Sequence, residues 1–158
     1  MKRIAVFPGS FDPITKGHEN IVKRASLLFD EIVVAIGSNS SKSSMFALEL
    51  RTEWLEKVFE SHPNVRVTNY DGLTIDFARS LGAGFLLRGV RNGGDFEYER
   101  TIAQMTKAMA PELETVILFT DPEFAAINST VVREILRNHG DVSQFVPDGI
   151  TVAYGAVR

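Results

Sequence analysis

The stretch PGSFDPITKGH, residues 8–18, follows a short apolar run and leads directly into a helical pattern. Its glycines let the backbone approach a ligand closely, and the free amides in the first turn of the following helix favour an anion. His18 falls at the helix start, where a neutral imidazole could donate a hydrogen bond to a phosphoryl oxygen, and Ser10 offers a hydroxyl nearby. Residues 8–18 therefore predict a strand, a phosphate-binding loop and a helix in succession.

Five short apolar runs predict buried β-strands at residues 4–7, 32–36, 65–67, 85–87 and 116–119. Apolar side chains at helical spacing separate and follow these runs: Ile21, Ala25 and Leu28, then Leu50, Trp54, Leu55, Val58 and Phe59, then Ile75, Ala78 and Leu81, then Ile102, Met105 and Met109, then Val131, Ile135 and Leu136. Strands that alternate with helices in this way require right-handed crossovers and a parallel sheet covered on both faces. The sequence therefore predicts an α/β fold, a Rossmann-like, doubly wound, five-stranded parallel sheet flanked by helices, in a single domain over residues 1–158.

Polar residues follow the ends of the predicted strands. In a doubly wound sheet, ligands bind outside the carboxyl ends of the strands, where the strand order reverses. We expect convergence there of Ser10 and His18 after the first strand, Lys42 after the second, residues 71–74 after the third, Arg88 and Arg91 after the fourth, and residues 128–130 after the fifth.

Composition excludes several classes of protein. The chain has no cysteine, which rules out disulfides, thiolate metal sites and a cysteine nucleophile. A net charge of −3 argues against general nucleic-acid binding, which needs a basic face. The apolar run after Lys2 and Arg3 is too short for an export signal or a membrane span. We predict a cytoplasmic protein that binds neither nucleic acid nor membranes.

Arg88 and Arg91 directly follow the fourth predicted strand. A guanidinium can bind a phosphate through two N–H groups. Gly89, which has no side chain, lets the backbone between the two arginines pass close beneath such a phosphate. Surface salt bridges to acidic residues that follow, such as Asp95 and Glu99, are the alternative explanation. The position at a strand end favours phosphate binding.

The sequence Asn128-Ser129-Thr130 precedes the last helical pattern. Helix capping explains one of these side chains, because Asn, Ser and Thr are preferred N-caps. Hydroxyl groups beside free helical amides also suit the phosphates of a nucleotide, so both interpretations stay open. Lys42, in a serine-rich loop, could close over reacting phosphates as a further cation, with a solvated lysine as the alternative.

These motifs together resemble those of a known enzyme superfamily. GSFDP at residues 9–13 followed by TKGH at residues 15–18 resembles the nucleotidyltransferases, and within them the phosphopantetheine adenylyltransferase family, which carries Thr-x-Gly-His. RGVR at residues 88–91 followed by DFEYE at residues 95–99 is similar to a signature of the same family. Residues 128–130 resemble the superfamily's Ile-Ser-Ser-Thr motif, with Asn128 in place of a serine.

The resemblance implies transfer of an adenylyl group from ATP to 4′-phosphopantetheine, giving 3′-dephospho-coenzyme A and pyrophosphate in coenzyme A biosynthesis. It implies Mg²⁺ held mainly by the nucleotide phosphates, binding of coenzyme A or dephospho-coenzyme A, and a homohexamer. The implied ATP-binding residues are Ser10, Phe11, His18, Gly89, Val90, Arg91, Glu99, Phe124, Ala125, Ala126, Ile127, Asn128, Ser129 and Thr130. The implied acceptor-binding residues are Ser10, Lys42, Leu73, Thr74, Arg88, Ile102, Met105 and Glu134, although periodicity alone places Leu73, Ile102 and Met105 in the core.

Catalytic roles are expected for His18, Lys42 and Arg91. The acceptor phosphate already carries its nucleophilic oxygen, so in-line attack needs neither a general base nor a covalent intermediate. One rival is a sister reaction on the same scaffold, with nicotinamide mononucleotide or a cytidylyl acceptor as substrate. Another is a nucleotide sensor that binds ATP without turnover, and product analysis separates these alternatives.

Overall fold

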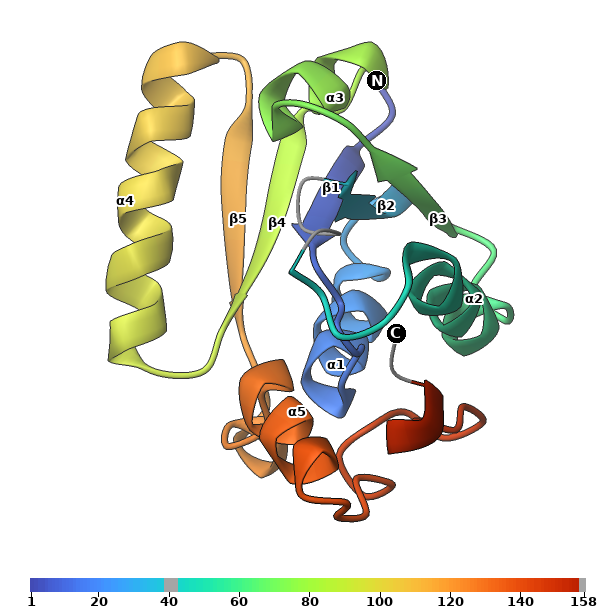
Figure 1. Ribbon diagram of the computed structural model, residues 1–158. Helices are drawn as coiled ribbons and strands as arrows, with labels where there is room; N and C mark the ends of the chain where they lie inside the picture. Colours follow the sequence, from blue (N-terminus) through green and yellow to red (C-terminus); the bar gives the residue numbers. More distant parts are fainter. Residues whose placement is uncertain (39–42, 157–158) are drawn as a thin grey trace.

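The computed structural model describes residues 1–38 and 43–156 and shows one five-stranded parallel sheet in the order β3-β2-β1-β4-β5 (Figure 1). The strands are β1 (Ile4–Gly9), β2 (Glu31–Gly37), β3 (Val65–Tyr70), β4 (Phe85–Val90) and β5 (Glu114–Phe119). The α-helices are α1 (Lys16–Ala25), α2 (Leu48–Phe59), α3 (Thr74–Ser80), α4 (Gly93–Met109) and α5 (Ser129–Arg137), and two 3₁₀ turns are η2 (Pro122–Phe124) and η3 (Tyr154–Ala156). The predicted doubly wound α/β fold is confirmed.

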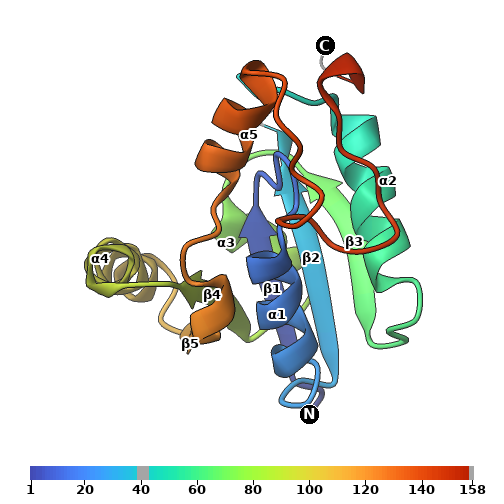
Figure 2. The same ribbon diagram turned by 90° about the horizontal axis from the view of Figure 1, so that it is seen from below.

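Alternating side chains of the central strands face two different cores. In β2, Ile32, Val34 and Ile36 join the larger core, with side chains from α1, α2 and α5, while Val33 and Ala35 join the smaller core near α3. All five of these side chains are fully buried, as expected for a parallel sheet covered on both faces. Figure 2 shows α1 and α2 on one side of the sheet and α3 on the other.

Strand β1 separates from β4 towards its carboxyl end. Along β2 it is paired over its whole length, from Ile4 with Glu31 to Gly9 with Ile36, but along β4 the pairs are only Ala5 with Phe85 and Val6 with Leu86. Because the order of the strands reverses between β1 and β4, this separation opens a crevice at the place where doubly wound folds bind ligands.

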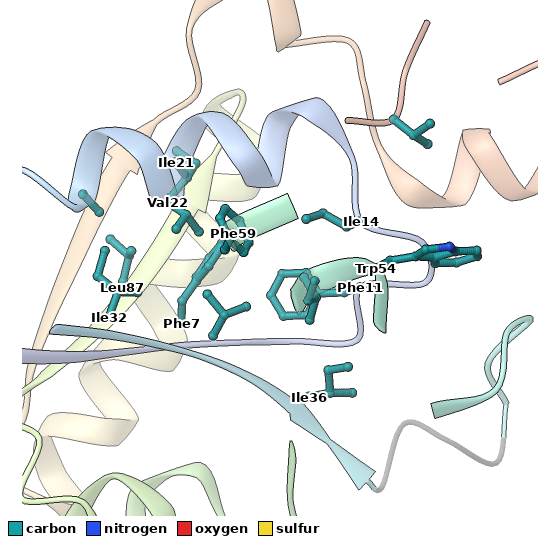
Figure 3. Close-up of a cluster of buried hydrophobic side chains, with 14 of the residues drawn as sticks. Phe7, Phe11, Ile14, Ile21, Val22, Ile32, Ile36, Trp54, Phe59 and Leu87 are labelled. Atoms are coloured by element: carbon teal, nitrogen blue, oxygen red, sulfur yellow. The ribbon is translucent and has the colours of Figure 1, made fainter. Parts of the chain in front are cut away.

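The loop that follows β1 is held by apolar side chains of its own. Phe11 and Ile14 are only 2% and 1% exposed and belong to the larger core, together with Phe7, Ile21 and Trp54 (Figure 3). Gly9 makes room for the Phe11 ring, since a Cβ at Gly9 would lie 3.0 Å from two ring carbons. Burial of these side chains makes the predicted phosphate-binding loop a fixed part of the core.

Several expectations about helical faces are wrong, including that for Val131 on α5, which is 50% exposed. Leu28 lies beyond the end of α1 at Ala25 and is 46% exposed, because the chain turns there towards β2. Met105 and Met109 on α4 are 61% and 54% exposed and not core residues. Helix α4 extends beside β4 and β5 at the edge of the sheet, so only part of its surface is covered (Figure 1).

Gly89 in β4 is required by helix packing. A Cβ at this position would lie 2.9 Å from Cγ1 of Ile21 on α1, closer than real Cβ contacts. We expect Gly89→Ala to lower the free energy of unfolding by about 1–3 kcal/mol through overpacking, measured by urea denaturation.

A double-mutant cycle provides the control for this prediction. Ile21→Ala removes the atom that would clash, so Gly89→Ala should cost much less in that background. Equal costs of Gly89→Ala in the two backgrounds would contradict the packing explanation.

Candidate active site

A hollow of about 390 Å³ lies at the crevice between the carboxyl ends of β1 and β4. Its walls come from the loop after β1, the start of α1, the end of β4, the start of α4 and the residues before α5. The predicted site residues that line it are Ser10, Phe11, His18, Arg88, Gly89, Arg91, Glu99, Ile127, Asn128 and Ser129. The structure thus brings together motifs that are more than a hundred positions apart in the sequence.

The Thr-x-Gly-His motif forms the N-terminal cap of α1. The N–H of Thr15 donates to Nδ1 of His18 at 3.1 Å, and the N–H of His18 donates to Oγ1 of Thr15 at 3.4 Å. A backbone amide can only donate, so Nδ1 must be the accepting nitrogen of the ring. The neutral imidazole therefore carries its proton on Nε2, which leaves Nε2 as the donor available to a ligand in the hollow.

The surroundings of His18 keep the imidazole neutral. Burial, together with the positive charges of Arg91 and Arg88, lowers its pKa from 6.5 to about 4. The ring also makes an edge contact with Phe11, with 5.0 Å between ring centroids. At neutral pH, His18 can donate one hydrogen bond from Nε2 without carrying a charge.

Each of the two predicted phosphate-binding arginines is held by a carboxylate. Arg88 donates from Nε and Nη2 to the two carboxylate oxygens of Glu99, both at 2.7 Å, and from Nη1 to the Pro8 carbonyl at 3.3 Å. Arg91 donates from Nε and Nη2 to Asp95 at 3.0 and 3.3 Å. The salt bridges raised as the alternative explanation are therefore present, yet both arginines still line the hollow.

Glu99 binds and orients the guanidinium of Arg88 in this structure. Both of its oxygens accept from the guanidinium, and its side chain is only 10% exposed. A guanidinium has five N–H groups, so Arg88 keeps two for a ligand after its three bonds to Glu99 and Pro8. The bidentate pair fixes the direction in which those two groups point.

The start of α5 combines capping with loop attachment. Oδ1 of Asn128 accepts from the N–H of Val131 at 2.8 Å, so the capping interpretation is correct for Asn128. The hydroxyl of Ser129 donates to the Pro13 carbonyl at 2.9 Å, which attaches α5 to the loop after β1. Ser129 can therefore offer a ligand its backbone amide and the lone pairs of its hydroxyl.

Other residues of the predicted nucleotide site lie outside the walls of this hollow. Thr130 is exposed, and its hydroxyl accepts from Arg133 at 3.2 Å. Val90 is fully buried at the end of β4. Phe124 ends the 3₁₀ turn η2, and Ala125 and Ala126 follow it. Only Ile127 of that segment lines the hollow.

A second hollow, of about 210 Å³ and mostly apolar, adjoins the first at Pro8 and Arg88. Of the predicted acceptor-binding residues, Leu73, Thr74, Arg88 and Ile102 line it. Met105 and Glu134 are not among the described residues that line either hollow. Glu134 is exposed on α5 and pairs with Arg137 at 3.4 Å.

Thr106 and Met109 also line the apolar hollow, and the sequence predictions assigned neither to a site. Ile102, Thr106 and Met109 are spaced i, i+4 and i+7 and so share one face of α4, whereas Met105, at i+3, is 61% exposed and does not line the hollow. Helical spacing alone does not distinguish Thr106, which is 7% exposed, from Met105, because positions i+3 and i+4 both lie on the same side of a helix as position i. Lys42 lies outside the described residues, and its predicted role stays a prediction.

Within residues 1–38 and 43–156 there is no group of three or more His, Asp or Glu side chains that could hold a metal ion. No helix in the same part of the chain is long and apolar enough to cross a membrane.

The sequence and fold match known proteins. The family model described as cytidylyltransferase-like matches residues 6–135. A phosphopantetheine adenylyltransferase of Phocaeicola vulgatus is 49% identical over 150 residues, which cover 95% of this chain and 99% of the relative. One of Flavobacterium psychrophilum is 47% identical, with the same coverage. This chain belongs to the phosphopantetheine adenylyltransferase family.

The family's fold also occurs in more distant solved structures. A bifunctional NMN adenylyltransferase/ADP-ribose pyrophosphatase of Francisella tularensis matches 95% of this chain and 46% of its own, with a TM-score of 0.71 and 16% identity. At that identity the match shows the fold alone. The family resemblance that residues 9–18, 88–99 and 128–130 suggested is thus confirmed over nearly the whole chain.

The depressed pKa of His18 predicts a pH-dependent stability. The unfolded chain takes up this proton near pH 6.5, but the folded chain only near pH 4. The unfolded state therefore binds more protons between these values, and the His18 contribution is present above pH 6.5 and is lost as the pH falls towards 4. We expect an NMR titration midpoint near pH 4 for the His18 ring.

His18→Gln provides the comparison for the stability measurement. The variant lacks the titrating group, so its free energy of unfolding should fall less than that of the wild type between pH 6.5 and pH 4. Parallel pH profiles, or a His18 midpoint near 6.5, would contradict the burial and charge effects described for the ring.

Proposed function

We propose that this protein transfers the adenylyl group of ATP to 4′-phosphopantetheine and releases 3′-dephospho-coenzyme A and pyrophosphate, as a step of coenzyme A biosynthesis. The observation that carries the proposal is the shared wall at Arg88, which joins a polar hollow to a narrow apolar one. Such a pair suits an acceptor with a phosphate at the end of a slender arm. The names of the closely similar relatives support the same reaction.

In the proposed reaction, an oxygen of the acceptor phosphate attacks the α-phosphorus of ATP. The new P–O bond forms as the bond to the pyrophosphate oxygen breaks, and no proton has to leave the nucleophile. Catalysis then consists of in-line positioning and of stabilising charge on the phosphoryl oxygens. No covalent intermediate with the protein is needed.

Polar groups of the larger hollow, together with Thr130 and Lys42 from outside its described walls, have distinct roles in this scheme. Nε2–H of His18 donates to a non-bridging oxygen of the α-phosphate as charge builds up in the transition state. Arg91 and the first turn of α5, with Ser129 and Thr130, hold the β- and γ-phosphates. The free N–H groups of Arg88 and the hydroxyl of Ser10 hold the acceptor phosphate, with Lys42 as the further cation.

Magnesium enters this scheme as part of the substrate. Mg²⁺ bound with ATP would supply positive charge that stabilises the leaving pyrophosphate. Asp95 and Glu99, the acidic residues that line the hollow, already accept from Arg91 and Arg88. Because these carboxylates already bind the arginines, we expect Mg²⁺ to be coordinated mainly by oxygens of the nucleotide. The homohexamer, the cytoplasmic location and the binding of coenzyme A stay predictions.

The reaction is tested by mass-spectrometric product analysis after incubation with ATP, Mg²⁺ and 4′-phosphopantetheine. Parallel samples contain nicotinamide mononucleotide or no acceptor. Dephospho-coenzyme A with an equal amount of pyrophosphate is the expected result. Product only with another acceptor would replace the proposed substrate, and ATP binding without any product would replace enzymatic function with nucleotide sensing.

His18→Ala should lower kcat by about 10²-fold or more, with a smaller change in KM, because the donor acts mainly in the transition state. Steady-state kinetics with both substrates varied measures this. His62→Ala, in the turn after α2 and outside the walls of both hollows, is the matched control and should keep the wild-type kcat. A normal kcat in His18→Ala would remove His18 from the mechanism.

A further inference from the structure

A completely buried arginine on α2, Arg51, holds the loop that carries Ser10 and Phe11. Its side chain is 0% exposed and donates from Nη1 to the Ser10 carbonyl at 2.7 Å. It also donates from Nε to the Phe46 carbonyl at 3.1 Å and from Nη2 to Oγ of Ser44 at 3.2 Å. One guanidinium thus connects the loop after β1 to the segment before α2.

A carboxylate of the loop after β1 binds back to the segment before α2. Asp12, which is 4% exposed, accepts from the N–H groups of Met45 and Phe46 at 2.7 and 2.9 Å. The carbonyl of Asp12 accepts in turn from Arg133 of α5 at 2.9 Å. The backbone of the loop is therefore fixed from both α2 and α5.

The bond from Arg51 determines the direction of one peptide group. The Ser10–Phe11 peptide is trans and planar, so its C=O and N–H point in opposite directions. The C=O points to Arg51, which lies outside the lining of the hollow, while Ser10 and Phe11 line it. The N–H of Phe11 therefore points away from Arg51, in a peptide whose two residues both line the hollow.

The backbone amides at the start of this loop have no protein partner in the described part of the chain. Within residues 1–38 and 43–156 neither the N–H of Ser10 nor that of Phe11 meets a protein acceptor. Phe11 also has a φ of +45°, a left-handed conformation that a bulky side chain rarely adopts. Such conformations persist where the surrounding structure determines them, and they gather at functional sites.

Stability alone does not account for the buried guanidinium. Removing a charge from water is costly, and well-packed apolar residues can often replace buried ion pairs without loss of stability. Among the described residues, Arg51 has acceptors in two segments, one of which lines the hollow. Orientation of that segment explains this arrangement.

We propose that Arg51 is a positioning residue that turns the Ser10–Phe11 peptide so that the Phe11 N–H donates to a phosphoryl oxygen. Phe11 supplies the donor and Arg51 acts through it. The proposal rests on the proposed adenylyl transfer, in which such a donor would stabilise charge on the reacting phosphates.

Binding of inorganic pyrophosphate tests the proposal without turnover. In amide correlation spectra of isotope-labelled full-length protein, the Phe11 resonance should move downfield on addition of pyrophosphate with Mg²⁺. No response at Phe11, while other residues of the hollow respond, would overturn the proposal in the wild type itself. This readout does not depend on which acceptor the enzyme uses, so it stays valid if the proposed substrate is wrong.

Two variants test the role of Arg51. Arg51→Met keeps an unbranched, flexible side chain and removes every donor, whereas Arg51→Lys keeps the charge but has one donor nitrogen in place of three. We expect Arg51→Met to lose the Phe11 response and to lower kcat by about 10²-fold with little change in KM, the loss typical of one oxyanion donor. Arg51→Lys should recover part of the Phe11 response and part of kcat. If Arg51→Met does not fold, Arg51→Lys is the variant that tests the proposal.

The matched control is Arg66→Met, which removes an exposed arginine of β3 that pairs with Glu31. Its kcat and its Phe11 response should equal those of the wild type. Rates are expressed per folded protein, with folding followed by circular dichroism. Lower thermal stability of the folded Arg51 variants with unchanged kcat and unchanged Phe11 response would show a purely structural arginine and overturn the proposal.

Discussion

The separation of β1 from β4 is the constraint on which the site depends. Parallel pairing brings the two strands together at Ala5 and Val6, and the ladder between them ends there. The candidate groups His18, from α1, and Arg88, from β4, line the crevice that opens beyond this point. Because β1 stays paired with β2 along its whole length, the crevice opens without loosening the sheet.

The charges around the crevice are arranged so that the site is preorganised. Arg88 and Arg91 are each held by a carboxylate, and their positive charges, together with burial, lower the pKa of His18. The imidazole is thereby a neutral donor whose tautomer is fixed by the amide of Thr15. Donors that are already oriented need little reorganisation when charge develops on a phosphoryl group.

Much of the candidate site could be predicted because its residues follow strand ends, and the ends of parallel strands share one edge. The Thr-x-Gly-His motif also specified a helix start that is now seen as a reciprocal cap between Thr15 and His18. The partners of the arginines were less predictable. Whether Arg88 contacts Glu99 alone or also a phosphate depends on the orientation of α4 relative to β4. The spacing of residues in the sequence does not determine this orientation.

By itself, the sequence determined the five strands, the alternation with helices and the motifs at the strand ends, because periodicity and local turn chemistry act over short distances. Only the tertiary structure decided that Met105 is exposed while Thr106 faces the apolar hollow, and that Arg51 reaches the Ser10 carbonyl across 41 positions. Burial of a side chain depends on what another element places against it. That placement results from packing of the whole chain and not from the neighbours of the residue in sequence.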